Sequence, residues 1–418
     1  MIDLVVVGLG YVGLPLLAEA TKAGLSVVGV DKSEDVVAGL SSGQSHVDDL
    51  SDYDIAELLD HGFTATSNPA AYGEARSIVI CVPTPLSADG GPELSAVISV
   101  TTAIAGQLSR GTLVVLESTT YPGTTEEVLR PLLEEGSGLT AGVDFHLAYS
   151  PERIDPGNNE YQLRNTPKVV GGLTPACTAA ARDLYSQFID TIVLAQGTRE
   201  AEAAKLLENT YRHVNIALVN EMARFFHELK VDFWDVIELA GTKPFGFQTF
   251  HPGPGVGGHC IPIDPNYLSH RVRSQLGYAF RFVELAQEIN ATMPAYVAQR
   301  AQELLNQHEL SVKGRTVLLL GVTYKPNISD QRESPSWAVA ARLMAMGANV
   351  QYHDPYVDEW SVPGVTPGNR DVFKAAARAD LTILLQNHDV YDADAIASSA
   401  SLFFDTRGVT RLPGVHRL

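Results

Sequence analysis

Cysteine is scarce in this chain of 418 residues, which contains only Cys81, Cys177 and Cys260. Three thiols cannot build a disulfide framework, and their odd number favours a reducing compartment such as the cytoplasm. Basic residues are also few, with 30 Lys and Arg against 49 Asp and Glu and a formal net charge of −19. This acidic excess argues against nucleic acid as a partner, because nucleic-acid phosphates attract basic surfaces.

Long apolar runs are absent as well. No stretch reaches the roughly 18 residues that a membrane-spanning helix needs, so we expect no membrane partner. The first residues, Met1-Ile2-Asp3, lead directly into an apolar strand rather than into a signal peptide. With 45% hydrophobic residues, the composition is that of a globular protein, and its length predicts two or three domains.

The first part of the chain alternates between short apolar strands and helical stretches. Strands are expected at 4–7, 26–30, 77–82, 113–117 and 145–149. Strands that alternate with helices form a parallel, doubly wound sheet. We therefore predict a Rossmann-like domain over residues 1–198.

The middle of the chain has a different composition and predicts mainly helices. Residues 199–229 contain no Pro or Gly and predict one long helix. Residues 242–267 are rich in Gly and Pro and predict a loop, and 277–307 predict a helical stretch interrupted at Pro294. We expect a central helical domain over 199–308 that also forms a subunit interface.

The last part of the chain repeats features of the first. An apolar strand is expected at 317–320, and the segment 347–354 repeats the spacing of 24–31, since a Gly precedes an Asp by seven residues in both. This pattern predicts a second Rossmann-like sheet over 309–418. The fold class is thus α/β, with two doubly wound parallel-sheet domains joined by a helical segment.

A glycine fingerprint follows the first strand at Gly8, Gly10 and Gly13. Gly8 allows a tight turn, Gly10 lets the backbone approach a pyrophosphate, and Gly13 permits close packing of helix on strand. Asp31 ends the next strand, where a carboxylate accepts hydrogen bonds from ribose hydroxyls and repels a 2′-phosphate. The pattern predicts NAD rather than NADP as cofactor, although Lys32 weakens this preference. The turn also places Tyr11 and Val12 at the cofactor.

Two further strand ends carry small polar residues. Pro83 and Thr84 follow one strand, and Ser118 and Thr119 follow the next. Ligands of open α/β sheets bind beyond the carboxyl ends of the strands. We expect these residues near the nicotinamide half of the cofactor, although such residues also occur in ordinary turns.

A glycine-dense segment, 253–264, holds the candidate nucleophile. A lone Cys is commonly a small buried hydrophobic residue. Cys260, however, follows a loop whose bare N–H groups can lower the pKa of a thiol and stabilise an oxyanion. Asp264 lies four residues later, where it can orient a water molecule or remove a proton. A zinc site of His251, His259, Cys260 and Asp264 is disfavoured, because these residues lack the usual ligand spacing.

The long helix carries a second set of polar residues. Lys205 and Asn209 are four residues apart and share one face, with Glu202 beside them. The ordinary interpretation is a solvated helix face. The functional interpretation is a cation and an amide that stabilise a developing alkoxide or thiohemiacetal anion.

Together these motifs resemble the nucleotide-sugar 6-dehydrogenases typified by UDP-glucose dehydrogenase. The resemblance covers essentially the whole chain. It rests on the motifs GLGYVGLP at 8–15, STTYPGT at 118–124, YSPER at 149–153, EAAKLLENTYR at 202–212, GPGVGGHCIPIDP at 253–265 and GVTYKPNISDQRESP at 321–335.

The resemblance implies a four-electron oxidation in which a C6 primary alcohol becomes a carboxylate and two NAD are reduced. It implies that Cys260 forms a thiohemiacetal and then a thioester that water hydrolyses. Lys205 and Asn209 would hold the oxyanion, and Asp264 would assist proton transfer. By the same resemblance Glu152 and Thr119 would position the hydrolytic water and the alcohol.

The resemblance also implies substrate and partner contacts. Lys325 and Arg407 would bind the nucleotide sugar in the third domain, together with Phe247, His251 and Gly257. Arg332 would reach the cofactor. Family members of this kind form dimers through their central helices, and a homodimer is implied here.

The branch that the loop at 243–265 resembles most is the one that oxidises UDP-N-acetylglucosamine. His251 stands where that branch often has Tyr, and 327–330 are less acidic than usual. UDP-N-acetylmannosamine, UDP-glucose and TDP-glucose therefore remain open as substrates. Two other interpretations are a zinc alcohol dehydrogenase and an NAD-binding regulator without turnover.

Overall fold

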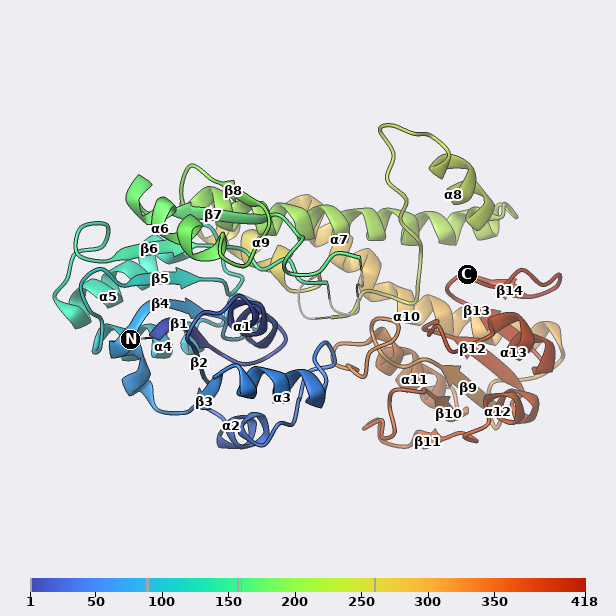
Figure 1. Cartoon of the computed structure of the whole chain (residues 1–418). Helices are drawn as coiled ribbons and strands as arrows, with labels where there is room; N and C mark the ends of the chain where they lie inside the picture. Colours follow the sequence, from blue (N-terminus) through green and yellow to red (C-terminus); the bar gives the residue numbers. More distant parts are fainter. Residues whose placement is uncertain (1, 88–89, 156–157, 159, 259–260) are drawn as a thin grey trace. The chain divides into compact units, whose positions relative to one another are not determined.

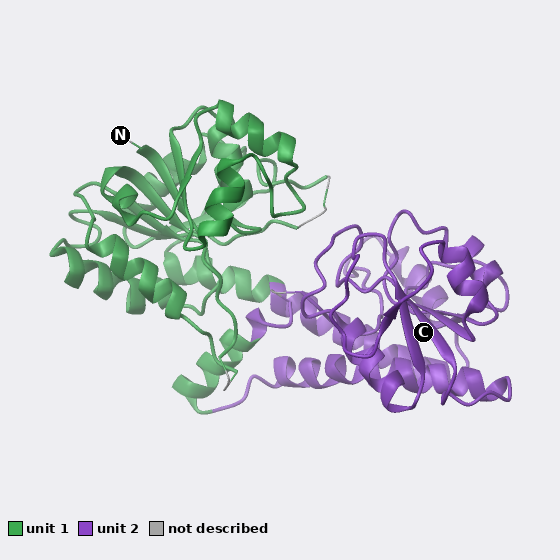
Figure 2. Ribbon diagram, turned by 90° about the horizontal axis from the view of Figure 1, so that it is seen from below, with its two compact units in different colours: residues 1–208, 266–277 green, residues 209–265, 278–418 purple. Residues whose placement is uncertain are grey.

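The computed structural model describes residues 2–87, 90–155, 158, 160–258 and 261–418. The chain divides into two compact units, coloured separately in Figure 2: residues 1–208 with 266–277, and residues 209–265 with 278–418. The division falls inside helix α7 (Thr198–Glu228), which is continuous in the structure. Within the described ranges, no helix is both long and apolar enough to cross a membrane.

The first unit contains an eight-stranded sheet with the strand order β3-β2-β1-β4-β5-β6-β7-β8 (Figure 1). All neighbouring strands are parallel except β6 and β7, which are antiparallel. The strands are β1 (Ile2–Val7), β2 (Val27–Val30), β3 (Thr64–Thr66), β4 (Ala75–Ile80), β5 (Leu113–Leu116), β6 (His146–Tyr149), β7 (Lys168–Gly172) and β8 (Ile192–Leu194). The doubly wound parallel sheet predicted from the sequence is confirmed, and β7 and β8, which run antiparallel to the other strands, are an addition to it.

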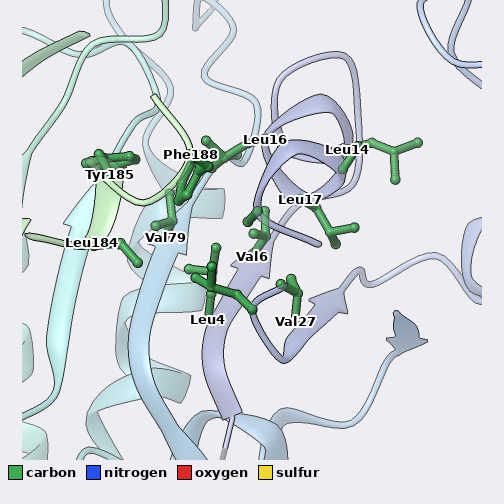
Figure 3. Packing of buried hydrophobic residues seen from close by; sticks show 14 of the residues in the cluster. Leu4, Val6, Leu14, Leu16, Leu17, Val27, Val79, Leu184, Tyr185 and Phe188 are labelled. Carbon is green, nitrogen blue, oxygen red and sulfur yellow. The ribbon is translucent and has the colours of Figure 1, made fainter. Parts of the chain in front are cut away.

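Both faces of this sheet are buried. Leu4 and Val6 of β1 pack in one cluster with residues of α1 and α6 (Figure 3), whereas Val5 and Val7 pack in another with residues of α4 and α5. Successive side chains of a strand point to opposite faces, so a continuous apolar run such as β1 serves both layers. The helices of this unit are α1 (Gly13–Lys22), α2 (Glu34–Ser41), α3 (Asp52–Asp60), α4 (Ser95–Ala105), α5 (Arg130–Ser137) and α6 (Pro175–Tyr185), with the short helices η1 (Pro69–Glu74) and η2 (Thr125–Leu129).

The second unit contains a six-stranded, fully parallel sheet with the order β11-β10-β9-β12-β13-β14. Leu319 of β9 packs in a cluster with α10 and α11, and Leu320 packs in a cluster with α12 and α13. This sheet is therefore also covered on both faces. Its strands are β9 (Thr316–Leu320), β10 (Asn349–His353), β11 (Thr366–Pro367), β12 (Leu381–Leu384), β13 (Phe403–Asp405) and β14 (His416–Arg417).

The helices of the central region depart from prediction in three places. The loop expected to reach residue 267 ends earlier, because α9 (Asp264–Leu276) begins at Asp264. Pro265 suits the first helical turn, where its missing N–H costs no hydrogen bond. Helix α10 (Arg281–Gln307) is not interrupted at Pro294, which is buried within it. Helix α8 (Phe233–Gly241) was not predicted. The remaining helices are α11 (Pro335–Ala345), α12 (Val372–Arg378) and α13 (Ala393–Ser399).

The two sheets repeat one local arrangement, as the sequence spacing indicated. Asp31 follows β2 and accepts a hydrogen bond from the N–H of Leu9 at 2.9 Å. Asp354 follows β10 and accepts one from the N–H of Val322 at 2.7 Å. In the second sheet, the carboxylate also lies 3.1 Å from Nε2 of His388, and both side chains are fully buried. This aspartate thus supports the interior of its sheet.

Candidate active site

The turn between β1 and α1 has the geometry that a dinucleotide fingerprint requires. Gly8 has a φ of +90°, which favours glycine. A Cβ at Gly13 would lie 1.9 Å from the carbonyl oxygen of Gly8, so only glycine fits there. Gly10 is exposed, and a Cβ there would meet no atom within 4 Å. The backbone at Gly10 is accordingly open to a phosphate group.

Asp31 is held in place beside this turn. Its carboxylate accepts from the N–H groups of Leu9 and Ser33, both at 2.9 Å. Each carboxylate oxygen can accept a further hydrogen bond, so the group retains capacity for ribose hydroxyls. Lys32 is exposed, and the hydroxyl of Tyr11 donates to Asp48 at 3.4 Å. These residues fit NAD.

The loops that follow β4 and β5 are tied together. The hydroxyl of Thr84 donates to the carbonyl oxygen of Thr119 at 2.8 Å. The hydroxyl of Ser118 donates to the carbonyl oxygen of Val82 at 2.7 Å. Pro83 is exposed between them. The structure thus brings together the strand-end residues that the sequence predicted to lie at the nicotinamide.

Glu152 and Lys205 form a buried pair in the first unit. The ammonium group of Lys205 donates to the backbone oxygen of Glu152 at 2.5 Å and lies 3.6 Å from its Oε2. Burial raises the pKa of the Glu152 carboxyl, although Lys205 lowers it in part. The Oε1 atom of Glu152 is buried without a hydrogen-bond partner among the described residues. A buried acceptor of this kind is suited to a substrate hydroxyl or a water molecule.

Glu202 has a different environment from the one expected. Its carboxylate accepts from the N–H of Gly123 at 2.5 Å, and from the N–H and hydroxyl of Thr125 at 2.9 and 2.7 Å. Burial raises the pKa of Glu202 to about 7. Glu202 therefore holds the turn after β5, whereas Lys205 contacts Glu152.

Asn209 and Asp264 meet in the second unit. The amide of Asn209 donates to Oδ2 of Asp264 at 2.5 Å. Asp264 is 2% exposed and begins α9, where the helix dipole favours a negative charge. The predicted nucleophile Cys260 lies outside the described residues, as does His259.

The glycine loop that precedes Cys260 is packed against α7 and the loop that follows β9. The N–H of Gly253 donates to Oδ1 of Asn220 at 2.9 Å. A Cβ at Gly257 would lie 2.8 Å from Cβ of Tyr324, and one at Gly258 would lie 2.9 Å from the Tyr324 ring. Glycine is therefore required for the loop to approach this tyrosine, which is adjacent to Lys325.

The substrate residues suggested by the resemblance have varied surroundings. Nε of Arg407 donates to the carbonyl oxygen of Leu385 at 2.6 Å. Arg332 forms a two-point ion pair with Asp330, at 2.9 and 2.8 Å, and its side chain is 56% exposed. His251 stacks on Trp234 with ring centroids 5.8 Å apart. Phe247 is exposed.

Sequence reasoning missed a buried ion pair. Lys168 lies 3.0 Å from Oε1 of Glu117, and the two side chains are 4% and 1% exposed. Glu117 directly follows β5 at a strand end where ligands bind, so its position was a usable signal. Lys168 carries no such signal, because the strand that it begins, β7, was not predicted. Elsewhere in the described ranges, no cluster of three or more His, Cys, Asp or Glu is arranged to hold a metal.

Comparisons with known proteins assign three consecutive parts of the chain to one family. Residues 2–189, 199–292 and 318–412 match the NAD-binding, central and UDP-binding domains of the UDP-glucose/GDP-mannose dehydrogenase family. The chain is 38% identical to the UDP-N-acetyl-D-glucosamine 6-dehydrogenase of Pseudomonas aeruginosa over 367 residues, which is 87% of this chain and 85% of that protein.

Solved structures give the same assignment. The UDP-D-ManNAc dehydrogenase of Pyrococcus horikoshii is 33% identical and has a TM-score of 0.89, with 99% of this chain and 98% of that chain covered. A UDP-glucose dehydrogenase of Pyrobaculum islandicum is 27% identical and has a TM-score of 0.88, with 100% and 97% covered. The chain belongs to the UDP-glucose/GDP-mannose dehydrogenase family and is an NAD-dependent nucleotide-sugar dehydrogenase.

Proposed function

We propose that this enzyme oxidises the C6 hydroxymethyl group of UDP-N-acetylglucosamine to a carboxylate. The choice of this sugar as substrate rests on the 38% identity, over 87% of the chain, to a UDP-N-acetyl-D-glucosamine 6-dehydrogenase. The second choice is UDP-N-acetylmannosamine, supported by the likeness to the Pyrococcus horikoshii structure. UDP-glucose and TDP-glucose are further alternatives. Family membership disfavours a zinc alcohol dehydrogenase.

The first oxidation converts the C6 alcohol to an aldehyde. Thr119 positions the alcohol, which loses its hydroxyl proton and a hydride from C6. When bound, NAD accepts one hydride in each of the two oxidations. Gly8, Gly10, Gly13 and Asp31 hold the cofactor, through the open backbone at Gly10 and the carboxylate of Asp31.

The second oxidation proceeds through a covalent adduct. The thiol of Cys260 adds to the aldehyde carbon and gives a thiohemiacetal, so the reactive aldehyde is not released. Loss of a second hydride and of the hydroxyl proton gives a thioester. Lys205 and Asn209, one turn apart on α7, stabilise the negative charge on oxygen.

Hydrolysis releases the product. Water attacks the thioester carbon, the carbon–sulfur bond breaks, and the sulfur recovers a proton. Glu152 positions this water through the buried acceptor Oε1. Asp264, held by Asn209 at 2.5 Å, assists the proton transfer.

The substrate contacts belong to the second unit. Lys325 and Arg407 supply positive charge for the diphosphate, and His251, Phe247 and Gly257 line the loop that carries Cys260. Arg332 is the residue that we propose for a cofactor contact. We further propose the division into an NAD-binding domain (1–198), a central helical domain with the cysteine loop (199–308) and a nucleotide-sugar-binding domain (309–418).

A homodimer formed by α7 is the proposed assembly. Three residues seven positions apart on this helix are exposed: Tyr211 at 48%, Leu218 at 51% and Phe225 at 42%. A spacing of seven places them on one face of the helix, and the stripe is too apolar for a solvated face. A second copy of the same stripe would cover it. The cytoplasm is the proposed location, consistent with the free thiols of Cys81 and Cys177.

The test is NADH formation with a panel of nucleotide sugars: UDP-N-acetylglucosamine, UDP-N-acetylmannosamine, UDP-glucose, UDP-galactose and TDP-glucose. We expect UDP-N-acetylglucosamine to be preferred, with two NADH formed for each sugar consumed. One NADH per sugar would contradict the four-electron mechanism. Preference for another sugar would overturn the proposed substrate and leave the proposed mechanism intact.

A further inference from the structure

The buried ion pair of Glu117 and Lys168 lies in the interior of the first unit. The ammonium group of Lys168 is 3.0 Å from Oε1 of Glu117. The hydroxyl of Tyr185 donates to the same oxygen, and the ammonium group lies 4.8 Å from the centre of its ring. Removing two charges from water costs several kcal/mol per ion, and an apolar pair of similar size is often at least as stable. The pair is therefore not explained by stability alone.

Glu152 lies beside this pair. Strands β6 and β7 are antiparallel, and Tyr149 pairs with Gly171. Beyond the paired residues, the hydroxyl of Ser150 donates to the carbonyl oxygen of Val169 at 2.7 Å, and Arg153 donates to that of Pro167 at 2.8 Å. These two hydrogen bonds flank Glu152 on one segment and Lys168 on the other. The register thus brings Glu152 alongside Lys168.

The charges around Glu152 come from several elements. Lys205 contributes a positive charge from α7 and Lys168 contributes one from β7, and both lower the pKa of the Glu152 carboxyl. Glu117, after β5, raises it, as does burial. The thiol of Cys81, after β4, faces the same groups, and burial raises its pKa so that it stays neutral. Glu117 and Lys168 therefore act on Glu152 in opposite directions.

We propose that Glu117 and Lys168 are positioning residues that set the charge state of the Glu152 carboxyl in the oxidation. The inference rests on the proposed function, in which Glu152 positions the hydrolytic water. The positive charge of Lys168 favours the ionised form of Glu152, and the negative charge of Glu117 favours the protonated form. Paired, their fields oppose each other at Glu152, whose carboxyl also responds to burial and to Lys205.

The inference is tested by the pH–rate profiles of two variants, which should shift in opposite directions from that of the wild type. The acid limb of kcat, measured between about pH 5 and 9, reports a group of the bound enzyme that must be ionised, and kcat includes the hydrolysis in which Glu152 acts. Glu117→Gln leaves the charge of Lys168 unbalanced and should move this limb down by about 1 pH unit. Lys168→Met leaves Glu117 unbalanced and should move it up by about the same amount. The double variant should bring the limb back toward the wild-type position.

Two further variants make the outcome decisive. Glu152→Gln should abolish the limb, and a limb that persists would show that it does not report Glu152. Single variants that fail to fold are replaced by Tyr185→Phe, which keeps both charges but removes the hydroxyl that partly neutralises Glu117, and it should move the limb up. Shifts of both single variants in the same direction, or none in any variant, would overturn the inference although the enzyme still forms two NADH. A wild-type enzyme that oxidises no nucleotide sugar would instead reject the proposed function.

Discussion

The Glu202 carboxylate is enclosed by the donors of Gly123 and Thr125, so its replacement has a defined cost. Glu202→Gln retains one accepting oxygen but turns an NH₂ group toward an N–H donor. An unsatisfied buried donor costs about 1–3 kcal/mol. We expect a lower melting temperature for this variant, measured by calorimetry.

The difference in stability between the wild type and Glu202→Gln should depend on pH, and the pKa of Glu202 sets the direction of that dependence. The pKa of Glu202 is about 7 in the folded protein, compared with about 4.3 in an unfolded chain. The folded state thus binds the proton more tightly, and this contribution to stability is complete below about pH 4.3 and is lost as the pH rises to 7. The advantage of the wild type over Glu202→Gln should shrink between pH 5 and 7. A difference that stays constant would mean that Glu202 is already ionised.

Cys260 is the residue on which the proposed covalent mechanism depends. Cys260→Ser should bind NAD with an unchanged Kd and form no acid, because an alkoxide neither forms as readily as a thiolate nor leaves as easily. Calorimetric NAD binding and product analysis are the measurements. Cys177→Ser is the matched control, since this buried cysteine lies in α6 and should leave turnover intact. Acid formation at the wild-type rate by Cys260→Ser would reject the thioester.

Individual site residues were predictable to different degrees. The fingerprint glycines, Asp31, Thr84 and Thr119 follow from their positions at strand ends, where the topology of the sheet dictates proximity. The contact of Lys205 with Glu152 requires a helix to pack on the loop after β6, 53 residues away in the chain, which no local pattern encodes. Glu202 was placed by helical periodicity on the face of Lys205, but its side chain reaches the turn after β5.

The β1–α1 turn is an element in which two glycines have separable roles. Gly13→Ala would place a Cβ 1.9 Å from the carbonyl oxygen of Gly8, whereas Gly10→Ala meets no atom within 4 Å. We expect Gly13→Ala to lower the free energy of unfolding by about 3 kcal/mol. Gly10→Ala should keep the wild-type melting temperature and weaken NAD binding by about tenfold, or about 1.4 kcal/mol. Equal melting temperatures for the two variants would contradict these roles.

Helices and strands were predicted best where a hydrophobic pattern extends over many residues or where an apolar run is continuous. The 31-residue helix α7 and the buried strands β1, β4, β5 and β9 are of this kind. The continuity of α10 through Pro294 was missed because local propensity counts the lost N–H and the steric clash of the ring. Tertiary packing outweighs that cost, since Met293, Tyr296 and Val297 around the proline all lie in the core of the second unit.

For the whole molecule, the exposed stripe on α7 predicts the oligomeric state. Leu218→Glu places a charge in the middle of the stripe and should convert a dimer to a monomer at micromolar concentration, as measured by sedimentation velocity. A charge buried in an interface without a partner is strongly unfavourable. Tyr53→Glu on α3 is the control, because Tyr53 is 78% exposed outside the stripe and should leave the mass unchanged. A wild-type monomer, or an unaffected Leu218→Glu dimer, would count against the proposed interface.

The boundary between the two compact units falls between Glu208 and Asn209, inside an unbroken helix. The usual places where a protease cuts or an engineer divides a protein are exposed loops between domains. Here such a cut would open the helical turn that carries Lys205 and Asn209. Separately expressed halves would each need to rebuild part of that turn before Lys205 and Asn209 could take up their proposed role together. Active fragments should therefore be obtainable by splitting the chain in a surface loop, and not by following the boundary of its units.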